Sequence, residues 1–224
     1  MQTFMTYFIL FMIYSFFGWL MEVIVTYPKA KKFVNRGFLI GPYCPIYGFG
    51  STMIILLLKR YYDDILVLFV MAAVVCSILE YMTSYFMEKI FKARWWDYSH
   101  LPFNINGRIC LQNSFTFGIL GIILVHFINP FLYNLVSLLP DIAMYIIFVL
   151  LSLIYVFDNI ISFKIMFNIK NLVSKVKMDG TEEITKKVKD MLLSKSHLFS
   201  RVVRTFPDFR VIVKNGITAI KKHI

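Results

Sequence analysis

Long uninterrupted apolar segments are the feature that most restricts how this chain can fold. Of its 224 residues, 58% are hydrophobic and only 17% are charged, and the mean hydropathy is +0.68. A soluble domain could not keep apolar blocks of this length away from water, whereas a bilayer core accepts helices of about 20 apolar residues. The pattern therefore predicts an all-α, polytopic integral membrane protein.

Five segments are long enough to be transmembrane helices. The second is unusual because Pro42 and Pro45 fall in its first half, where they remove backbone donors. We expect this helix to be broken, with an irregular or re-entrant entry followed by regular helix from about Ile46. The Asn129-Pro130 pair predicts the end of the fourth span and a short interfacial helix after it. The predicted spans are residues 4–26, 37–58, 65–91, 109–128 and 142–163, with the interfacial helix at 131–139.

Lysine and arginine residues are distributed unevenly between the two sides that five spans would create. One side receives only Lys59 and Arg60, whereas the other receives the basic loops within 29–36 and 89–108 and the basic C-terminal region. Cytoplasmic loops are enriched in these residues. We therefore predict a multi-pass protein of the cell membrane, with its N-terminus outside and its C-terminus in the cytoplasm.

The composition changes after the last predicted span. From Lys164 onward there are 14 basic and 5 acidic residues, which predicts a transmembrane domain at 1–168 and a basic cytoplasmic tail at 169–224. Asp179 and Glu182 resemble a capping box, and apolar residues then recur at helical spacing. We expect amphipathic tail helices on the anionic inner leaflet. The alternatives are a tail that only fixes topology and one that docks a partner; no nucleic acid is expected.

Ionisable side chains inside the predicted spans indicate a candidate site. At about 1.5 Å per residue, Glu22, Glu80 and Asp158 lie at a similar depth near the cytoplasmic face, and Arg108 lies at the start of the fourth span. Charged groups within a bilayer are costly and usually face a bundle interior or a cavity. The alternative is a structural ion pair between Arg108 and one or two of these acids. We interpret Glu88 as part of a solvated turn.

The loop before the fourth span concentrates aromatic, amide and charged side chains. Trp95 and Trp96 can be explained by an interfacial aromatic belt, but Asp97 and the polar run at 104–108 cannot. Such a loop either packs as a cap over the helices or binds a polar group. Its Arg108 guanidinium is planar and can make two parallel hydrogen bonds to a carboxylate or phosphate. Asn113, one turn into the span, must bond to another helix or to a ligand.

Other chemistry is not indicated. The sequence lacks G-x-x-x-x-G-K-[ST], H-E-x-x-H and G-x-S-x-G, the signatures of nucleotide-hydrolysing proteins, zinc peptidases and serine hydrolases. Cys44, Cys76 and Cys110 are far apart, and we interpret them as small buried hydrophobic residues. A Cys44 thiol activated near Arg36 is the alternative. We predict no metal and no cofactor, and we favour a role without catalysis.

Four segments are similar to the motifs of a known family. FFGWLMEV at 16–23, FVNRGFLIGPYCPIYGFG at 33–50, LEYMTSYFMEKIF at 79–91 and ARWWDYSHLPFNINGRICL at 93–111 resemble the bacterial putative ABC-transporter type IV, or CmpB, membrane family. The resemblance covers about residues 4–158. It implies a permease and carries no established role for any residue. The candidate substrate-binding residues, taken from these motifs and from the ionisable and amide residues above, are Glu22, Asn35, Arg36, Tyr43, Glu80, Trp95, Trp96, Asp97, Tyr98, Asn104, Asn106, Arg108, Asn113 and Asp158.

Three classes of function are consistent with this pattern. The first is a transport-related, permease-like component that binds an anionic or zwitterionic small molecule or lipid headgroup at a polar site on the cytoplasmic side. Such a component would work as a homo-oligomer or with a partner subunit. The second is a membrane enzyme that acts on an amphiphile, with Glu80 or Asp97 as general base. The third is a lipid-binding scaffold. We favour the first, which depends on the family resemblance.

Overall fold

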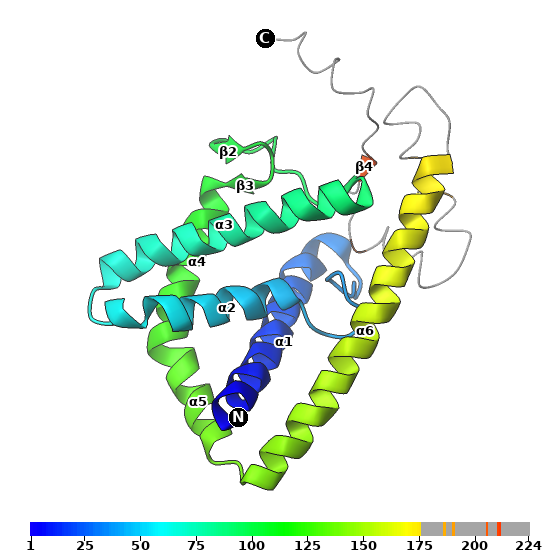
Figure 1. The fold of residues 1–224 in the computed structure, drawn as a ribbon. Coiled ribbons are helices and arrows are strands. Elements are labelled where there is room, and N and C mark those ends of the chain that lie inside the picture. The colour runs from blue at the N-terminus through cyan, green and yellow to red at the C-terminus, as the bar shows by residue number, and fades with distance from the viewer. Residues whose placement is uncertain (176–185, 187–189, 191–204, 206–209, 212–224) are drawn as a thin grey trace.

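The computed structural model describes residues 1–175, 186, 190, 205 and 210–211. The chain is almost entirely helical within these residues (Figure 1), which confirms the predicted fold class. The elements, in chain order, are α1 (Gln2–Ala30), α2 (Pro45–Leu58), the 3-10 turn η1 (Lys59–Tyr61), α3 (Ile65–Phe91), β1 (Ala93–Arg94), β2 (Asn104–Ile105), β3 (Ile109–Cys110), α4 (Leu111–Ile123), the π-helical turn η2 (Leu124–Ile128), α5 (Asn129–Ser137), α6 (Asp141–Lys175) and β4 (Arg210–Val211).

Four helical segments are long and apolar enough to cross a membrane. They are Gln2–Pro28, Ile65–Phe91, Leu111–Ser137 and Asp141–Asn168. The second predicted span differs, because its helix α2 has only 14 residues. At about 1.5 Å per residue this helix is about 21 Å long, which is shorter than a hydrocarbon core of about 30 Å. The described residues thus contain four helical segments that are long enough to span a bilayer and one short helix, rather than five full-length helices.

The break before α2 is confirmed. Residues 31–44 form no helix or strand, and α2 begins at Pro45, where a missing N–H costs nothing because the first helical turn has no partner for it. The loop is held from two sides. The backbone N–H of Cys44 donates to the carbonyl of Ser15 on α1 at 2.8 Å, and Asp158 on α6 accepts from two other loop amides. Irregular backbone is stable at membrane depth when protein groups satisfy it in this way.

The predicted break at Asn129-Pro130 is wrong. Helix continues from Leu111 to Ser137, with the π-helical turn η2 directly before the proline. A π turn shifts the backbone bonding from the i−4 to the i−5 carbonyl, and Asn129 accordingly donates to Leu124. Pro130 then occupies the first turn of α5. The first helix likewise continues past the predicted end at residue 26 and contains Pro28.

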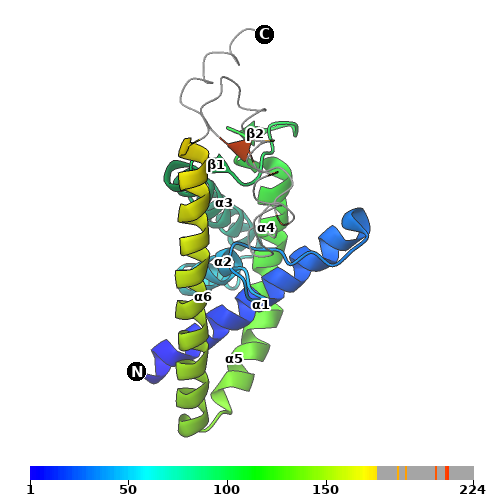
Figure 2. The ribbon, with the colours of Figure 1, turned by 90° about the vertical axis from the view of Figure 1, so that its right-hand side faces the viewer.

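The two ends of α6 lie at opposite ends of the molecule. At one end, the Gln2 amide donates to Asp141 at 2.8 Å, which joins the N-terminus to the start of α6. At the other end lie the loop between α3 and α4 and the end of α6, whereas the loop after α1 and the turn between α2 and α3 lie between the two ends (Figures 1 and 2). Strand β4 pairs with β1 in antiparallel register. The predicted capping box and most of the predicted amphipathic tail helices fall outside the described residues.

Candidate functional site

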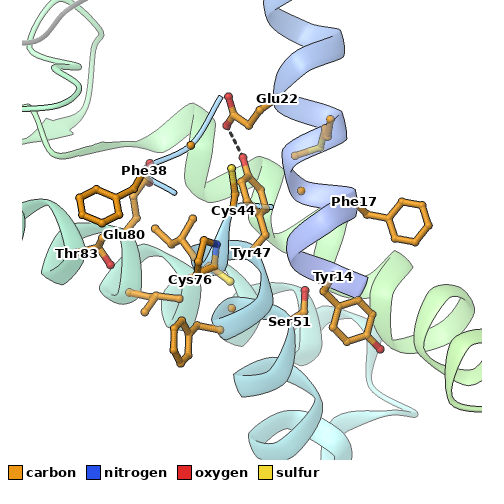
Figure 3. Close-up of a pocket in the computed structure, with 18 of the residues that line it drawn as sticks. Tyr14, Phe17, Glu22, Phe38, Cys44, Tyr47, Ser51, Cys76, Glu80 and Thr83 are labelled. Carbon is orange, nitrogen blue, oxygen red and sulfur yellow. Dashed lines mark hydrogen bonds between the residues drawn. The ribbon is translucent and has the colours of Figure 1, made fainter. Parts of the chain in front are cut away.

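A cavity of about 1050 Å³ lies among the helices and is the candidate site. Its walls come from α1, the loop before α2, α2, α3, the loop between α3 and α4, α4, η2, α5 and α6. They are mostly aromatic and aliphatic, and Tyr14, Ile54, Leu124 and Leu132 belong both to the cavity wall and to the main hydrophobic core. A large apolar cavity with a few polar groups is the usual form of a small-molecule site. Figure 3 shows part of this cavity around α2.

Glu22 is the polar group that α1 contributes to the cavity. The Tyr47 hydroxyl on α2 donates to Glu22 Oε1 at 2.5 Å, and the Arg36 guanidinium lies 3.5 Å from Oε2 (Figure 3 shows the tyrosine bond). The Tyr47 ring can approach α1 this closely because residue 18 is glycine, where any Cβ would collide with the ring. Glu22 is therefore held in an ion pair and does not simply extend into solvent.

Glu80 is the polar group that α3 contributes, and it is only 8% exposed. The Tyr98 hydroxyl donates to Oε1 at 3.2 Å. Oε2 is buried and has no hydrogen-bond partner among the described residues. The Asn113 amide approaches Glu80 without reaching ordinary hydrogen-bond geometry. Burial, followed by the nearby Glu80 carboxylate, raises the pKa of Tyr98 well above its usual range, so the phenol remains a donor.

Asp158 has a different environment, although it lies on a span like the other two acids. Its carboxylate accepts hydrogen bonds from the backbone of Ile40 at 2.8 Å and of Gly41 at 2.6 Å. It also accepts from the hydroxyls of Tyr43 at 2.6 Å and Ser162 at 2.8 Å. Four donors use the acceptor capacity of a carboxylate almost fully. Asp158 thus holds the loop that enters α2.

Asn35 fixes the same loop from the other side. Its side-chain oxygen accepts from the Trp19 indole at 2.7 Å, and its amide nitrogen donates to the Ile40 carbonyl at 2.8 Å. Thr205 of the C-terminal region donates to the Asn35 backbone carbonyl at 2.8 Å, and its own carbonyl accepts from Arg36. Thr205 is 1% exposed. The loop between α1 and α2 is therefore tied to α1, α6 and the tail.

Arg108 forms an ion pair outside the cavity. Its guanidinium lies 3.1 Å from Glu88 Oε2, and Arg94 approaches the same oxygen at 3.1 Å. The guanidinium also lies over the rings of Tyr81 and Tyr85. The interpretation of Glu88 as a solvated turn residue is wrong, because this side chain is 19% exposed and bridges two arginines. The structural ion pair expected for Arg108 thus exists, but with a different acid.

The polar run at 104–108 is a tight hairpin between β2 and β3. Asn106 and Gly107 both have positive φ, at 53° and 65°, and Arg108 N donates to the Ile105 carbonyl at 3.0 Å. Asn-Gly is the preferred pair for this kind of turn. The Asn106 amide donates to the Tyr81 hydroxyl at 2.9 Å, and the Trp96 indole donates to the Arg108 carbonyl at 3.1 Å. The hairpin therefore packs as a cap on α3.

Six of the fourteen sequence-predicted residues line the cavity, namely Glu22, Arg36, Glu80, Trp95, Trp96 and Tyr98. The other eight surround it, hold its loops or belong to the cap: Asn35, Tyr43, Asp97, Asn104, Asn106, Arg108, Asn113 and Asp158. The prediction omitted Tyr47 and Thr83, which also line it. Tyr47 lies within the segment that resembles the family motif, whereas nothing in the sequence distinguishes Thr83 from other span residues.

The comparisons with known proteins give one match. A model of the family described as putative ABC-transporter type IV matches residues 9–163. The matched range contains every described residue of the cavity wall and ends before the basic tail. It confirms the resemblance seen in the sequence motifs. No curated protein and no solved structure matches the chain.

Proposed function

This chain belongs to the putative ABC-transporter type IV family, and from that premise we propose that its cavity binds the transported molecule or a lipid that controls transport. The ligand is an anionic or zwitterionic small molecule or lipid headgroup, bound on the cytoplasmic side. The 224 residues contain no phosphate-binding loop.

The observation that carries this proposal is the combination of a large apolar cavity with charged groups at its edge. Glu22, Arg36 and Glu80 all line it. Charged groups inside a membrane protein are retained against a considerable cost, which supports a functional role for them. Two carboxylates and one guanidinium favour a zwitterion over a simple anion, since Arg108 already pairs with Glu88 outside the cavity.

A cavity-blocking substitution tests this proposal. Thr83 lines the cavity, so Thr83→Trp fills part of it with a large ring. Thr116 is an exposed residue of α4 outside the cavity wall, so Thr116→Trp is the matched control. Native mass spectrometry of protein released from nanodiscs should show a stoichiometric small molecule or lipid on the wild type and the control. Thr83→Trp should lose it; equal occupancy of all three proteins would refute the proposal.

We assign the hairpin cap, the end of α6 and the α1–α2 loop to the cytoplasmic side. The basic residues Arg36, Arg94 and Arg108 belong to these segments, and basic residues prefer the cytoplasmic side. The N-terminus is then outside, which requires α2 and its irregular entry loop to cross the bilayer as a fifth span. Tyr61→Cys and Ser99→Cys, each with the native cysteines replaced by alanine, should react with an impermeant maleimide from opposite sides. Labelling of both from one side would contradict this orientation.

The enzyme alternative depends on Glu80. Asp97, the other proposed base, lies outside the cavity wall, where it accepts from the Ser99 backbone at 3.0 Å and pairs with Arg94 at 3.5 Å. Glu80→Gln should abolish turnover in an enzyme. In a transport component it should change ligand affinity while transport of a saturating ligand persists. A complete loss of chemical conversion of a membrane amphiphile in this variant would favour the enzyme.

A further inference from the structure

Glu80 has one carboxylate oxygen that the protein satisfies and one that it does not. Oε1 accepts from Tyr98, whereas the buried Oε2 has no hydrogen-bond partner among the described residues. An unpaired carboxyl oxygen in an apolar environment is costly, and a donor that reaches it removes that cost. The side chain belongs to a residue that is only 8% exposed and lines the cavity, so the missing donor would come from a cavity ligand.

The geometry points to a lipid with a primary ammonium headgroup, whose N–H groups bind Glu80 and whose phosphate binds Arg36. This inference rests on the proposed function and names the class of ligand. A primary ammonium is compact and carries three donors. A quaternary ammonium carries no N–H and cannot supply a hydrogen bond to Oε2. A hydroxyl headgroup can donate to Oε2 but carries no positive charge to pair with the carboxylate.

Arg36 supplies the matching positive charge for the phosphate. Among the described cavity-lining residues it is the one basic side chain. Its guanidinium donates to the Thr205 carbonyl and makes a single long contact of 3.5 Å with Glu22, and the side chain remains 24% exposed. A guanidinium has five donors and can contact a carboxylate and a phosphate together. Arg36, its partner Glu22 and Glu80 all line this one cavity, so both headgroup charges have binding groups on its wall.

The apolar part of the cavity indicates a lipid rather than a free headgroup. Several lining side chains are also strongly exposed, with Phe17 at 49%, Phe86 at 48%, Phe127 at 68% and Phe131 at 68%, and Figure 3 shows Phe17 pointing away from α2. The cavity wall therefore continues onto the surface that faces the bilayer. Acyl chains can lie along this surface while the headgroup reaches the carboxylate. A water-soluble zwitterion would gain nothing from such an opening.

Lipids that differ only in the headgroup test the inference. Purified protein is exchanged into nanodiscs that contain equal amounts of phosphatidylethanolamine, phosphatidylcholine and phosphatidylglycerol with identical acyl chains. Lipids that stay bound on release are counted by native mass spectrometry. Wild-type protein should retain about tenfold or more phosphatidylethanolamine than either other lipid, because only this lipid donates a hydrogen bond from a charged group to Glu80. Glu80→Gln, an isosteric change, should reduce the preference to about onefold.

Asp63→Asn is the matched control, since it removes one carboxylate from an exposed turn outside the cavity wall. It should keep the wild-type preference. Lipids bound without a preference for phosphatidylethanolamine, or a preference that survives in Glu80→Gln, would overturn the inference and leave the proposed function intact. If wild type and Thr83→Trp bind each of the three lipids to the same extent, the proposed function is overturned instead. Displacement of the lipid by millimolar phosphoethanolamine alone would overturn the lipid assignment, because it would show that the acyl chains are not recognised.

Discussion

The three acids of the membrane-spanning helices have three different roles because their neighbours differ. Asp158 is saturated by four donors of the α1–α2 loop and its own helix. Glu22 is paired with Tyr47 and Arg36, and Glu80 is only half satisfied. Each acid was equally conspicuous in the sequence, because hydropathy shows that a charge is buried but not which donors surround it. The partners are set by the fold, which for Asp158 brings together segments more than 100 residues apart.

Asp158→Asn should destabilise the protein strongly. An amide places an N–H₂ group against donors that need an acceptor, so at least one backbone N–H of the loop loses its partner. We expect a loss of roughly 2–4 kcal/mol, measured as a lower thermal midpoint in detergent. Asp141→Asn is the control, because that acid is exposed and accepts one hydrogen bond from Gln2. Equal midpoints for the two variants would show that the carboxylate does not hold the loop.

Arg108→Gln should separate stability from binding. The substitution leaves Glu88 with only one arginine partner and removes the contacts with the two tyrosine rings. We expect a loss of roughly 3 kcal/mol in stability. The preference for a lipid headgroup should not change, because Arg108 does not line the cavity. Loss of lipid selectivity in a variant that is still folded would place Arg108 in the binding site.

At the scale of elements, the sequence predicts the regular parts better than the interruptions. The bounds of α3 were predicted to the residue, because a polar turn and a basic loop border a continuous apolar run. The break before α2 was predictable from two prolines. The continuation of helix through Asn129-Pro130 was not, because a π turn depends on backbone bonding that no residue pattern reveals. The pairing of Glu88 with Arg108 was missed because it depends on the hairpin that returns the chain to α3.

Two glycines on the cavity wall should respond differently to alanine. A Cβ at Gly18 collides with the Tyr47 ring, whereas a Cβ at Gly50 meets Cys76 Sγ at 3.5 Å and Leu79 Cδ2 at 3.6 Å, which is ordinary contact. Gly18→Ala should cost roughly 1–3 kcal/mol by overpacking. Gly50→Ala should be neutral or stabilising by up to about 1 kcal/mol, since alanine favours helix. Chemical denaturation in mixed micelles gives both free energies of unfolding. A Gly18→Ala variant that is as stable as Gly50→Ala would show that Tyr47 does not pack closely on α1.

The contact between the tail and the α1–α2 loop should protect one tail position. Thr205 is buried and bonded to Asn35 and Arg36, whereas Lys186 is exposed. Thr205→Cys should therefore react with maleimide about tenfold or more slowly than Lys186→Cys, each with the native cysteines replaced by alanine. Equal rates would mean that the tail does not cover the loop in the folded protein.

At the scale of the whole molecule, the short α2 and the loop before it form part of the cavity wall. The helix has 14 residues, and Gly37, Leu39 and Cys44 of the loop line the cavity beside Tyr47 of α2. The loop is held by α1, α6 and the tail, and its Arg36 side chain lines the cavity with the acids of α1 and α3. Discontinuous helices that bring polar groups to a membrane cavity are typical of transport proteins. This arrangement supports a site that receives an amphiphile from the bilayer.

Photo-crosslinking locates a bound lipid most directly. Wild-type protein is reconstituted with phosphatidylethanolamine that carries a photoactivatable group at the end of one acyl chain, and the crosslinked residues are identified by peptide mass spectrometry. Crosslinks should concentrate on cavity-wall residues such as Met21, Leu79 and Phe86, and Thr83→Trp should remove them. Two results together would contradict a lipid-binding cavity. Crosslinks would be spread evenly over exposed residues outside the wall, such as Leu150 and Leu153 on α6, and Thr83→Trp would leave them unchanged.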